Sequence, residues 1–410
     1  MSKEKRRVPK LRFPGFTEDW EQRKLGSLAT VEMNKRIFKE QTTIKGDIPF
    51  YKIGTFGSDA DSFISRELFK EYKNKYPYPN IGDILISASG SIGRTVVYNG
   101  EDAYYQDSNI VWLNHNGKID NSFLLQFYNQ VKWAGLEGST IKRLYNKNIL
   151  ETNIALPKIE EQRLIGKFFE LVDRSITLHQ RKLNNLKLKK KALLQKLFPK
   201  NEERYPELRF PGFTDAWEQC KLSVLATMNA RIGWQNLRTS EFLDNGDYLL
   251  ITGTDFDNGR IKYSTCHYVE KKRFDQDTKI QLSTGSILIT KDGTLGKVAL
   301  VEELPKPATL NAGVFNVRVK DDAFLSYKYL YHYLKAPFLM KYVTANATGG
   351  TIKHLNQSIL VDFPIPITGK QEQDRIAKLL DSLESIITLH QRKLDHLQLQ
   401  KKALLQQMFV

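Results

Sequence analysis

The sequence predicts an α+β fold in which two modules of mixed short strands and helices are separated by two long helices that form an antiparallel coiled coil. Two observations lead to this expectation. The chain of 410 residues repeats itself once, and each repeat ends in a long run of apolar residues at heptad spacing. A chain of this length also exceeds one ordinary domain. We expect a first module over 1–160, a first helix over 161–200, a second module over 201–370 and a second helix over 371–410.

The internal duplication is most evident at the start of each half. Residues 9–29 (PKLRFPGFTEDWEQRKLGSLA) recur as residues 206–226 (PELRFPGFTDAWEQCKLSVLA), identical at most positions. Between the shared ends the halves diverge, which indicates two complete modules of one fold with different surfaces, because the period is far too long for a solenoid. The weaker matches pair 82–87 (GDILIS) with 285–290 (GSILIT), 90–94 (GSIGR) with 293–297 (GTLGK), and 138–144 (GSTIKRL) with 349–355 (GGTIKHL).

The long helices are predicted over 161–198 and 372–409, which both contain ITLHQRKL and no proline. Their apolar residues follow alternating steps of three and four, the pattern of a coiled-coil seam. The simplest arrangement pairs the two helices antiparallel, so that the modules are related by a pseudo-two-fold axis. The seam residues are Ile165, Phe169, Val172, Ile176, Leu183, Leu186, Leu193 and Leu197 in the first helix, and Ile376, Leu380, Leu383, Ile387, Leu394, Leu397, Leu404 and Met408 in the second.

Polar residues occupy matched places in this seam: His179 and Lys190 in the first helix, His390 and Lys401 in the second. One interpretation is that they fix the register of the pair, as polar core positions of coiled coils do. The other is that the lysines extend to solvent and the histidines lie at the edge of the seam.

The divergent regions show the short apolar runs and glycine turns of strands. Two longer segments, 123–133 and 325–340, are predicted to be helical. Each module is therefore expected to mix strands with helices. The predicted strands are 84–87, 95–98, 110–113, 248–252, 287–290, 297–301 and 314–319.

The charge balance favours a polyanionic partner. The formal net charge is +16 and the sequence pI is about 9.5, and a surplus of this size is typical of proteins that bind nucleic acid. The two cysteines, Cys220 and Cys266, have no metal-ligand spacing, which fits a reducing compartment. We find no signal peptide and no run near the ~18 apolar residues of a membrane span. We therefore expect a cytoplasmic protein.

Motifs for catalysis are missing from the sequence. It contains no G-x-x-x-x-G-K-[ST] phosphate loop, no [DN]-P-P-[YF] motif of amino-methyltransferases, no H-E-x-x-H and no C-x-x-C. The seven histidines form no nucleophile–base pattern. We expect neither a catalytic centre nor a metal site nor a cofactor in this chain.

Basic and aromatic residues interleave at several places, and these are the candidates for DNA contact. Arg and Lys can neutralise phosphates or bond guanine, and Asn and Gln can bond adenine. For any single residue, a plain surface role is the alternative. The candidates are Asn34, Lys35, Arg36, Lys73, Lys75, Ser89, Ser91, Arg94, Gln106, Lys142 and Arg143 in the first half, and Arg231, Trp234, Lys271, Lys272, Arg273, Lys291, Thr294, Lys297 and Lys353 in the second, with Asn109, Gln235, Asn236 and Asn311 as further amides in the divergent parts.

The glycine turns at 90–93 and 293–296 have two interpretations. Their backbone N–H groups could face a phosphate beside Arg94 or Lys297. They could also be tight hairpins, and their recurrence at the same place in both modules favours this role in the fold.

The combination of these motifs resembles one family, the specificity subunits of type I restriction–modification enzymes. The LRFPGFT segments (11–17 and 208–214), the Trp-Glu-Gln that follows each, the ITLHQRKL repeats, the GDILI skeleton and the Thr-Ile-Lys segments all match it. The resemblance covers essentially the whole chain.

The resemblance implies a DNA-reading role. Each module would be a target-recognition domain for one half of a bipartite double-stranded DNA site, and the long helices would set the gap between the halves. Two modification subunits would bind S-adenosylmethionine and methylate adenine, and ATP-dependent restriction subunits would cleave. Two rival interpretations are a stand-alone DNA nuclease or methyltransferase, and a coiled-coil scaffold that binds nucleic acid or another acidic partner.

Overall fold

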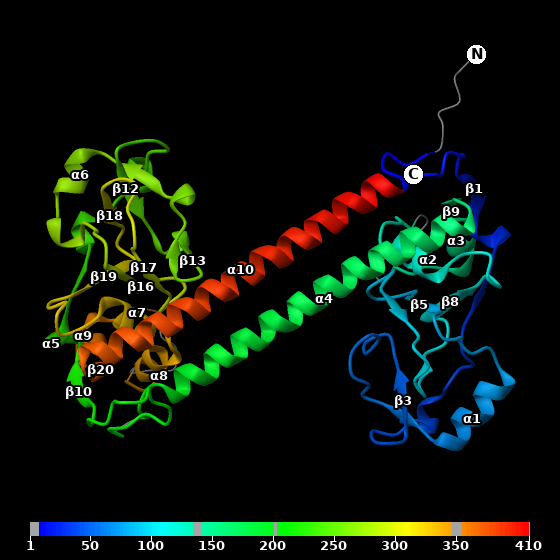
Figure 1. Cartoon of the computed structure of the whole chain (residues 1–410), viewed down its shortest axis with the longest axis horizontal. Helices are drawn as coiled ribbons and strands as arrows, with labels where there is room; N and C mark the ends of the chain where they lie inside the picture. Colours follow the sequence, from blue (N-terminus) through cyan, green and yellow to red (C-terminus); the bar gives the residue numbers. More distant parts are fainter. Residues whose placement is uncertain (1–7, 134–141, 201–202, 347–353, 410) are drawn as a thin grey trace, which may run out of the picture. The chain divides into compact units, whose positions relative to one another are not determined.

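The computed structural model describes residues 8–133, 142–200, 203–346 and 354–409. The chain divides into two compact units (Figure 1): unit 1 comprises residues 1–181 and 391–410, and unit 2 comprises residues 182–390. The division falls within both long helices. Each unit therefore contains the first part of one long helix and the last part of the other.

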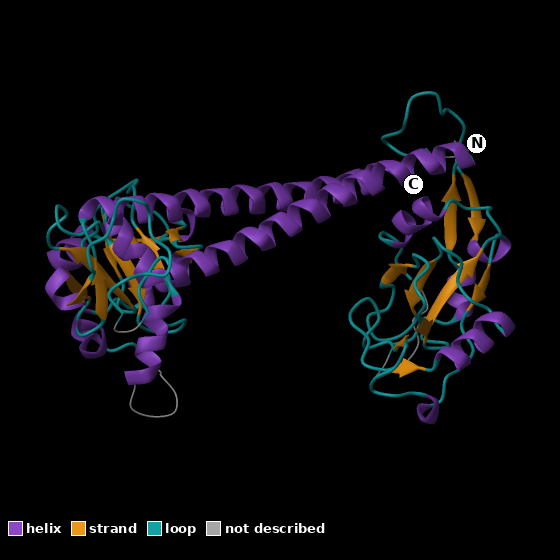
Figure 2. Ribbon diagram, turned by 60° about the horizontal axis from the view of Figure 1, so that its bottom comes forward, coloured by secondary structure: helices purple, strands orange, loops and turns teal. Residues whose placement is uncertain are grey.

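The described residues of unit 1 form three small sheets, and strands are drawn in orange in Figure 2. A four-stranded antiparallel sheet has the order β2-β8-β5-β6, a three-stranded sheet has the order β4-β3-β7, and β1 pairs with β9. In the three-stranded sheet β3 is antiparallel to β4 and parallel to β7. The strands are β1 (Glu21–Lys24), β2 (Thr30–Glu32), β3 (Ile48–Tyr51), β4 (Phe63–Ile64), β5 (Ile84–Ser87), β6 (Thr95–Val97), β7 (Tyr104–Tyr105), β8 (Ile110–Asn114) and β9 (Asn153–Leu156).

Unit 2 repeats these sheets with the same pairing. Its four-stranded sheet has the order β11-β19-β16-β17, its three-stranded sheet the order β15-β12-β18, and β10 pairs with β20. It adds the hairpin β13-β14. The strands are β10 (Glu218–Lys221), β11 (Ala226–Ala230), β12 (Tyr248–Ile251), β13 (Phe256–Asp257), β14 (Arg260–Ile261), β15 (His267–Val269), β16 (Ile287–Thr290), β17 (Val298–Leu300), β18 (Ala308–Leu310), β19 (Val314–Val319) and β20 (Pro364–Ile367).

Short helices complete both units, and two long helices run through them. The short helices are α1 (Arg66–Lys75), α2 (Asn121–Tyr128), α3 (Asn146–Glu151), α5 (Leu222–Leu225), α6 (Lys271–Asp275), α7 (Tyr327–Lys335), α8 (Pro337–Asn346) and α9 (Gln357–Val361), and the long ones are α4 (Ile159–Lys196) and α10 (Lys370–Met408). The 3-10 turns are η1 (Leu25–Ser27), η2 (Lys39–Gln41), η3 (Gly233–Gln235), η4 (Thr239–Glu241), η5 (Gly253–Asp255), η6 (Tyr263–Thr265) and η7 (Thr278–Ile280).

The α+β fold is confirmed, and all seven predicted strands form within a residue or two. The predicted helices differ in detail. The segment 123–133 is helical only to Tyr128, and 325–340 is divided between α7 and α8. The division falls at Pro337, whose ring is tolerated at the first position of a helix but not inside one. The three-stranded sheet of unit 1 includes two strands of two residues, β4 and β7, which periodicity cannot detect.

Both long helices are confirmed, and within each unit they pair antiparallel (Figures 1 and 2). In unit 1, Asp173 of α4 lies 2.6 Å from Lys401 of α10. In unit 2, Lys190 of α4 forms an ion pair with Glu384 of α10. Both seam lysines are mostly buried, at 19% and 18% side-chain exposure. Each has a carboxylate partner on the opposite helix, so the interpretation that they extend to solvent is wrong.

The residues that directly follow each long helix complete the core of a unit. In unit 1, Phe409 stacks on Phe123 with ring centroids 5.1 Å apart, and both contact Trp20. In unit 2, Phe198 contacts Trp217 and Tyr329, and the ring centroids of Phe198 and Tyr329 are 5.5 Å apart. Aromatic side chains bury large areas, so these contacts are a main part of each core.

A close approach of α2 to α4 depends on Gly166. A Cβ added at this position would lie 1.8 Å from the Ser122 hydroxyl and 2.9 Å from the Phe123 nitrogen. Gln162 of α4 accepts a hydrogen bond from the Asp120 N–H, and Gln373 of α10 accepts one from Ser326 in the same way in unit 2. The first turn of each long helix is thus fastened to its module by an equivalent amide.

In unit 2, buried charges also join α7 to the long helices. His332 and Lys328 bond to Asp381 at 2.8 and 2.9 Å, and Lys335 bonds to Glu384 at 2.9 Å. Burial disfavours the Asp381 carboxylate, but the hydrogen bonds from His332 and Lys328 outweigh it and lower the pKa of Asp381 to about 2. The carboxylate therefore stays ionised throughout the physiological pH range.

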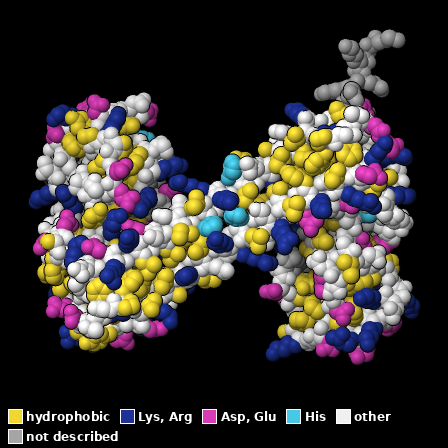
Figure 3. Space-filling model, in the orientation of Figure 1, with side chains coloured by type: hydrophobic (Ala, Val, Ile, Leu, Met, Phe, Trp, Pro, Cys, Tyr) yellow, Lys and Arg dark blue, Asp and Glu magenta, His cyan; other side chains and the backbone are white. Residues whose placement is uncertain are grey.

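The surface is mixed in charge and partly apolar. On the face shown in Figure 3, Lys and Arg side chains are interspersed with Asp and Glu on both units, and hydrophobic side chains are exposed between them. Three of the exposed apolar residues, Leu164, Leu171 and Leu178, are spaced by seven along α4 and are 45%, 58% and 56% exposed. This spacing places them on one line of the helix.

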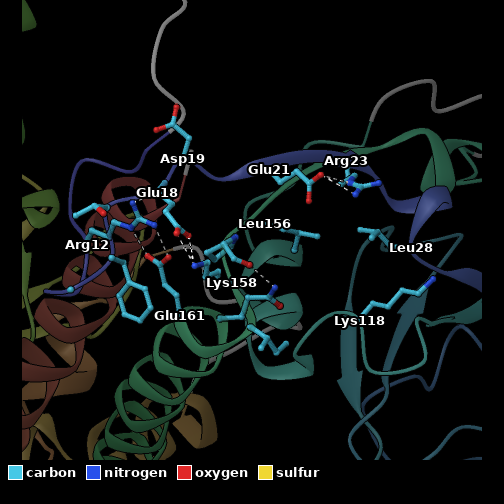
Figure 4. A pocket seen from close by; sticks show the side chains of 16 residues that line it. Arg12, Glu18, Asp19, Glu21, Arg23, Leu28, Lys118, Leu156, Lys158 and Glu161 are labelled. Carbon is cyan, nitrogen blue, oxygen red and sulfur yellow. Dashed lines mark hydrogen bonds and ion pairs between the residues drawn. The ribbon is translucent and has the colours of Figure 1, made fainter.

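A buried ion pair fixes the start of each module to the first turn of a long helix. In unit 1, the Arg12 guanidinium donates two hydrogen bonds, of 2.7 and 2.8 Å, to the Glu161 carboxylate, whose side chain is 1% exposed (Figure 4). In unit 2, Arg209 bonds to Glu372 at 2.8 and 2.9 Å with the same burial. The duplicated Leu-Arg-Phe-Pro-Gly segment therefore has a structural role.

The ion pair of unit 1 borders a cavity of about 470 Å³ at the start of α4. Two exposed ion pairs line it as well: Lys158 with Glu18, and Arg23 with Glu21 (Figure 4). These charged groups satisfy one another, so we assign no ligand to this cavity.

Replacing Arg12 by Ala is expected to destabilise unit 1 by about 3–5 kcal/mol, because it leaves the buried Glu161 carboxylate without its partner. Hydrogen exchange of the β5 and β8 amides would measure this change within unit 1. The matched control is Arg23→Ala, which removes an exposed ion pair worth at most about 1 kcal/mol. Equal losses from the two variants would refute a special role for the buried pair.

Candidate nucleic-acid interface

The loop after β5 and the loop after β16 have the same internal hydrogen bonds. We call residues 87–94 and 290–297 the glycine loops. In unit 1 the Ser87 hydroxyl donates to the Ser91 carbonyl and accepts from the Arg94 N–H at 2.9 Å. In unit 2 the Thr290 hydroxyl donates to the Thr294 carbonyl and accepts from the Lys297 N–H, also at 2.9 Å. A hydroxyl at the end of the strand therefore closes each loop.

Glycine is required in these loops because the backbone is left-handed there. Gly90 and Gly93 have φ of 64° and 82°, and Gly293 and Gly296 have 71° and 70°. The Gly93 N–H bonds to the Ser87 carbonyl, and the Ile92 and Arg94 N–H groups also bond within the loop. These amides are occupied, and the loop joins antiparallel strands, so the hairpin interpretation is favoured over a phosphate cradle.

The end of each Thr-Ile-Lys segment lies against the glycine loop. The Leu144 N–H donates to the Ala88 carbonyl at 2.8 Å, and the Leu355 N–H donates to the Lys291 carbonyl at 2.8 Å. This contact brings together two motifs that are about 50 residues apart in the sequence of each module. It also places Arg143 opposite Ser89 in an antiparallel bridge.

In unit 1, residues 106–109 join this cluster. The Ser89 hydroxyl donates to the Asn109 side-chain oxygen at 2.8 Å, and the Arg143 guanidinium donates to the Ser108 carbonyl at 3.1 Å. Gln106 accepts from the Ile53 N–H at 3.0 Å. Ser108 has a positive φ of 53°, which presents its carbonyl to Arg143.

Arg36 is linked to the cluster through Asp107, and two other basic candidates of unit 1 pack on an aromatic ring. Arg36 lies 3.8 Å from Asp107 and also lies over the Phe38 ring. The ammonium groups of Lys35 and Lys75 lie 5.2 and 5.6 Å from the centroid of the Tyr76 ring. Lysine and arginine stems that pack on aromatic rings keep their charge in the solvent.

The other candidates of unit 1 are exposed or half-buried. Lys73 lies over the Phe69 and Tyr78 rings and 3.7 Å from Asp102. The exposed Arg94 side chain bonds to the Gly57 carbonyl at 3.1 Å. Lys142 and Ser91 are exposed.

In unit 2, the candidates Lys291, Thr294 and Lys297 lie in the glycine loop, and the latter two are exposed. Lys291 lies 5.6 Å from the centroid of the Phe315 ring, and its N–H bonds to the Gly313 carbonyl. The Asn311 side chain accepts from the Ala312 N–H at 2.8 Å.

A second group of unit 2 candidates surrounds α6. Arg273 lies 2.9 Å from Glu241 and donates to the carbonyls of Gln235 and Asn236 at 3.2 and 3.1 Å. Lys271 pairs with Asp275, and Lys272 is exposed. The side chain of Trp234 and the whole of Lys353 lie outside the described residues.

Two candidates are buried and cannot touch DNA in this conformation. Asn34 is 2% exposed and donates to the Pro77 carbonyl at 3.2 Å. Arg231 is 2% exposed and donates to the Leu310 carbonyl at 2.8 Å and to the Thr309 hydroxyl at 3.2 Å. Burial and the nearby charge of Arg273 lower the pKa of Arg231. Asn34 instead bonds to the segment that follows α1, and Arg231 bonds to β18.

The sequence alone could not reveal the residues that complete the clusters. Asp107 and Ser108 of unit 1 have no motif around them, and Asp292 of unit 2 directly precedes the GTLGK motif without being part of it. Only the fold brings these three residues beside Arg36, Arg143 and His354. Among residues 8–133, 142–200, 203–346 and 354–409, no group of three His, Cys, Asp or Glu side chains could hold a metal ion. No helix in this described part is long and apolar enough to cross a membrane.

Comparison with known proteins identifies one family. The model of the type I restriction modification DNA specificity domain matches residues 17–188 and again residues 215–399. A putative type I restriction enzyme specificity subunit of Haemophilus influenzae is 54% identical over 157 residues, which cover 37% of this chain and 41% of the relative. A specificity subunit of Methanocaldococcus jannaschii is 22% identical over 408 residues, covering 96% of this chain and 92% of the relative.

Solved structures show the same fold. The crystal structure of a type I restriction–modification S subunit from M. genitalium superimposes with a TM-score of 0.62 at 15% identity, covering 98% of this chain and 99% of the other. A structure described as the basis of complex assembly and conformational transition of the type I system has a TM-score of 0.54 at 17% identity, with the same coverage.

Replacing Thr290 by Val should cost about 1–3 kcal/mol of unfolding free energy, because it leaves the Lys297 N–H and the Thr294 carbonyl without their partner. Thr344→Val is the matched control, since the Thr344 hydroxyl is exposed and donates only to the Met340 carbonyl of its own helix. Denaturant unfolding monitored by a unit 2 probe such as Trp217 fluorescence would compare them. If both variants were as stable as the parent chain, the hydroxyl would not hold the loop.

Proposed function

The chain belongs to the family of type I restriction–modification DNA specificity domains, and from this premise we propose that each unit reads one half of a bipartite DNA site through the surface around its glycine loop. The family membership confirms the resemblance seen in the sequence. The family and its relatives are named for specificity, which supports a role as the DNA-recognition component of the enzyme.

One observation carries the proposal for how the two halves are read. The two units share a loop framework down to individual hydrogen bonds, but the side chains around it differ. A shared framework with different side chains is what two readers of different sequences require, because base edges are distinguished by their donors and acceptors. We assign residues 1–160 and 201–370 to the two target-recognition domains, and residues 161–200 and 371–410 to the spacer.

Phosphate and base contacts would have separate sources. Lys35, Lys75, Lys142, Lys272 and Lys297 are exposed and would neutralise phosphates, which gives affinity that falls steeply with salt. Arg36, Arg94 and Arg143 in unit 1, and Lys291 and Thr294 in unit 2, lie at or beside the loop clusters and would face the base edges. Arg273 would do so from the group around α6. Asn34 and Arg231 support the fold rather than this interface.

The chemistry is assigned to partner subunits. We propose that two modification subunits bind S-adenosylmethionine and methylate adenine, and that ATP-dependent restriction subunits cleave, so this chain would need no cofactor. The adenine must leave the duplex stack to be methylated, and that step would belong to the modification subunit. The assembly would work in the cytoplasm, where its DNA substrate lies.

Methylome sequencing of cells with and without the gene tests this function. We expect adenine methylation at one two-part motif to disappear with the gene, and to return when the intact chain is supplied. A purified chain, tested alone, should neither cleave nor methylate DNA. Its DNA affinity should fall with salt, with a slope of about −0.9 for each phosphate contacted.

Two outcomes would contradict the proposal. If methylation changes at no motif while the modification subunit is expressed, the chain is a scaffold and does not choose the DNA sequence. If the purified chain alone cuts or methylates DNA, it is a stand-alone enzyme. A cell carrying an inactive modification subunit serves as the control for methylation from other sources.

The leucine line on α4 supports a docking site for a modification subunit. Leu164, Leu171 and Leu178 are more exposed than seam residues such as Ile165 and Phe169, which are buried. An exposed apolar line at heptad spacing matches an amphipathic helix of a partner. We therefore assign this line of α4 to the contact with one modification subunit.

Replacing Leu171 by Arg should abolish or strongly weaken co-purification with the modification subunit, because it places a charge in the centre of the apolar line. The control, Thr177→Arg, adds the same side chain at an exposed position on another face of α4. Size-exclusion chromatography of the mixed subunits measures the result. Unchanged assembly with the Leu171 variant would exclude this line as the docking site.

A further inference from the structure

Two positions in each unit are held in the same place but differ in side-chain chemistry. In each unit a backbone hydrogen bond joins the end of the Thr-Ile-Lys segment to the glycine loop. One position directly follows the residue whose carbonyl accepts this bond, and the other directly precedes the residue whose N–H donates it. In unit 1 these positions are Ser89 and Arg143, beside the Ala88–Leu144 bond. In unit 2 they are Asp292 and His354, beside the Lys291–Leu355 bond. Because the backbone bond is 2.8 Å in both, the two pairs occupy equivalent sites.

The unit 1 pair presents a donor that is held in position. The Arg143 guanidinium is fixed by the Ser108 carbonyl at 3.1 Å and lies 5.8 Å from the centroid of the Tyr145 ring. The bond to Ser108 uses one of the five N–H donors of this guanidinium. The Ser89 hydroxyl is held by Asn109 at 2.8 Å. A fixed arginine fork matches the O6 and N7 acceptors of guanine.

The unit 2 pair presents an acceptor at the equivalent site. The Asp292 carboxylate lies 2.6 Å from His354 Nδ1, and the two side chains are 42% and 70% exposed. A carboxylate facing DNA is repelled by phosphates, but it can accept a hydrogen bond from the amino group of cytosine. The histidine beside it reduces that repulsion and orients the carboxylate.

We propose that these pairs are the specificity-determining residues of the two half-sites: Ser89 and Arg143 read a guanine in one half, and Asp292 and His354 read the amino group of a cytosine in the other. The inference rests on the proposed function and adds which residues choose the bases. The backbone bond positions each pair, and the side chains carry the sequence information. The difference between the pairs gives one chain two different half-sites.

An exchange of the pairs tests the inference in the complete enzyme. The double variant Asp292→Ser with His354→Arg gives unit 2 the pair of unit 1, and Ser89→Asp with Arg143→His does the reverse. Each is supplied with the modification subunit in cells that lack the native chain, and the methylome is sequenced. We expect each double variant to change one half of the motif only, a different half for each, and to lower methylation of the original motif about tenfold to a hundredfold.

Two further variants separate specificity from folding and charge. Asp292→Asn keeps the shape of the side chain but can donate as well as accept, and should therefore relax the preference at a single base pair. The control is Lys221→Arg with Asp362→Ser, which alters an exposed ion pair of unit 2 whose charged atoms lie 2.7 Å apart. It removes one carboxylate, as the exchange at Asp292 and His354 does, and it should leave the methylated motif unchanged. Thermal unfolding of each variant confirms that it is folded.

The outcomes are distinguishable. If the parent chain directs no methylation, the proposed function itself fails. If the parent chain directs methylation and the folded exchange variants and Asp292→Asn leave both halves of the motif unaltered, the inference is overturned while the function stands. A change in the same half from both exchanges would also overturn it, because the pairs would then not belong to separate readers.

Discussion

The architecture depends on one buried ion pair that occurs twice. Arg12 with Glu161, and Arg209 with Glu372, fasten the beginning of each module to the first turn of a long helix. The carboxylates are almost completely buried, so each needs its two guanidinium hydrogen bonds to remain charged there. The pair therefore fixes where the module ends and the helix begins. It also accounts for the duplicated Leu-Arg-Phe-Pro-Gly segment, whose arginine is the partner of the buried carboxylate in both units.

The second constraint on the architecture is that both units share the two long helices. Each unit holds the first part of one long helix and the last part of the other, and the terminal aromatics Phe198 and Phe409 belong to the cores. The seam lysines, Lys190 and Lys401, pair with carboxylates of the opposite helix. A slip of one heptad would separate these charges, which is how polar seam positions specify register. Neither unit can therefore form its core from its own half of the sequence alone.

The proposed DNA-recognition surfaces of the two units have the same backbone framework but different side chains. Ser87 and Thr290 close the glycine loops with identical hydrogen bonds, and Leu144 and Leu355 dock on them identically. The chain can change the groups beside these bonds without altering the backbone, because the framework uses main-chain atoms and one hydroxyl. The fold thus separates the residues that hold the surface from those that differ between its two copies.

The duplication, the α+β class, three of the four strands of each four-stranded sheet, the two long helices and the family could be predicted from the sequence, because each leaves a periodic or repeated pattern in the order of residues. Only the tertiary structure decided which candidates share a surface. Arg143 and Ser108, or Asp292 and His354, are far apart in the chain and meet through the docking of one loop on another. It also showed that Asn34 and Arg231 are buried, since burial depends on what packs over a residue and not on its own polarity.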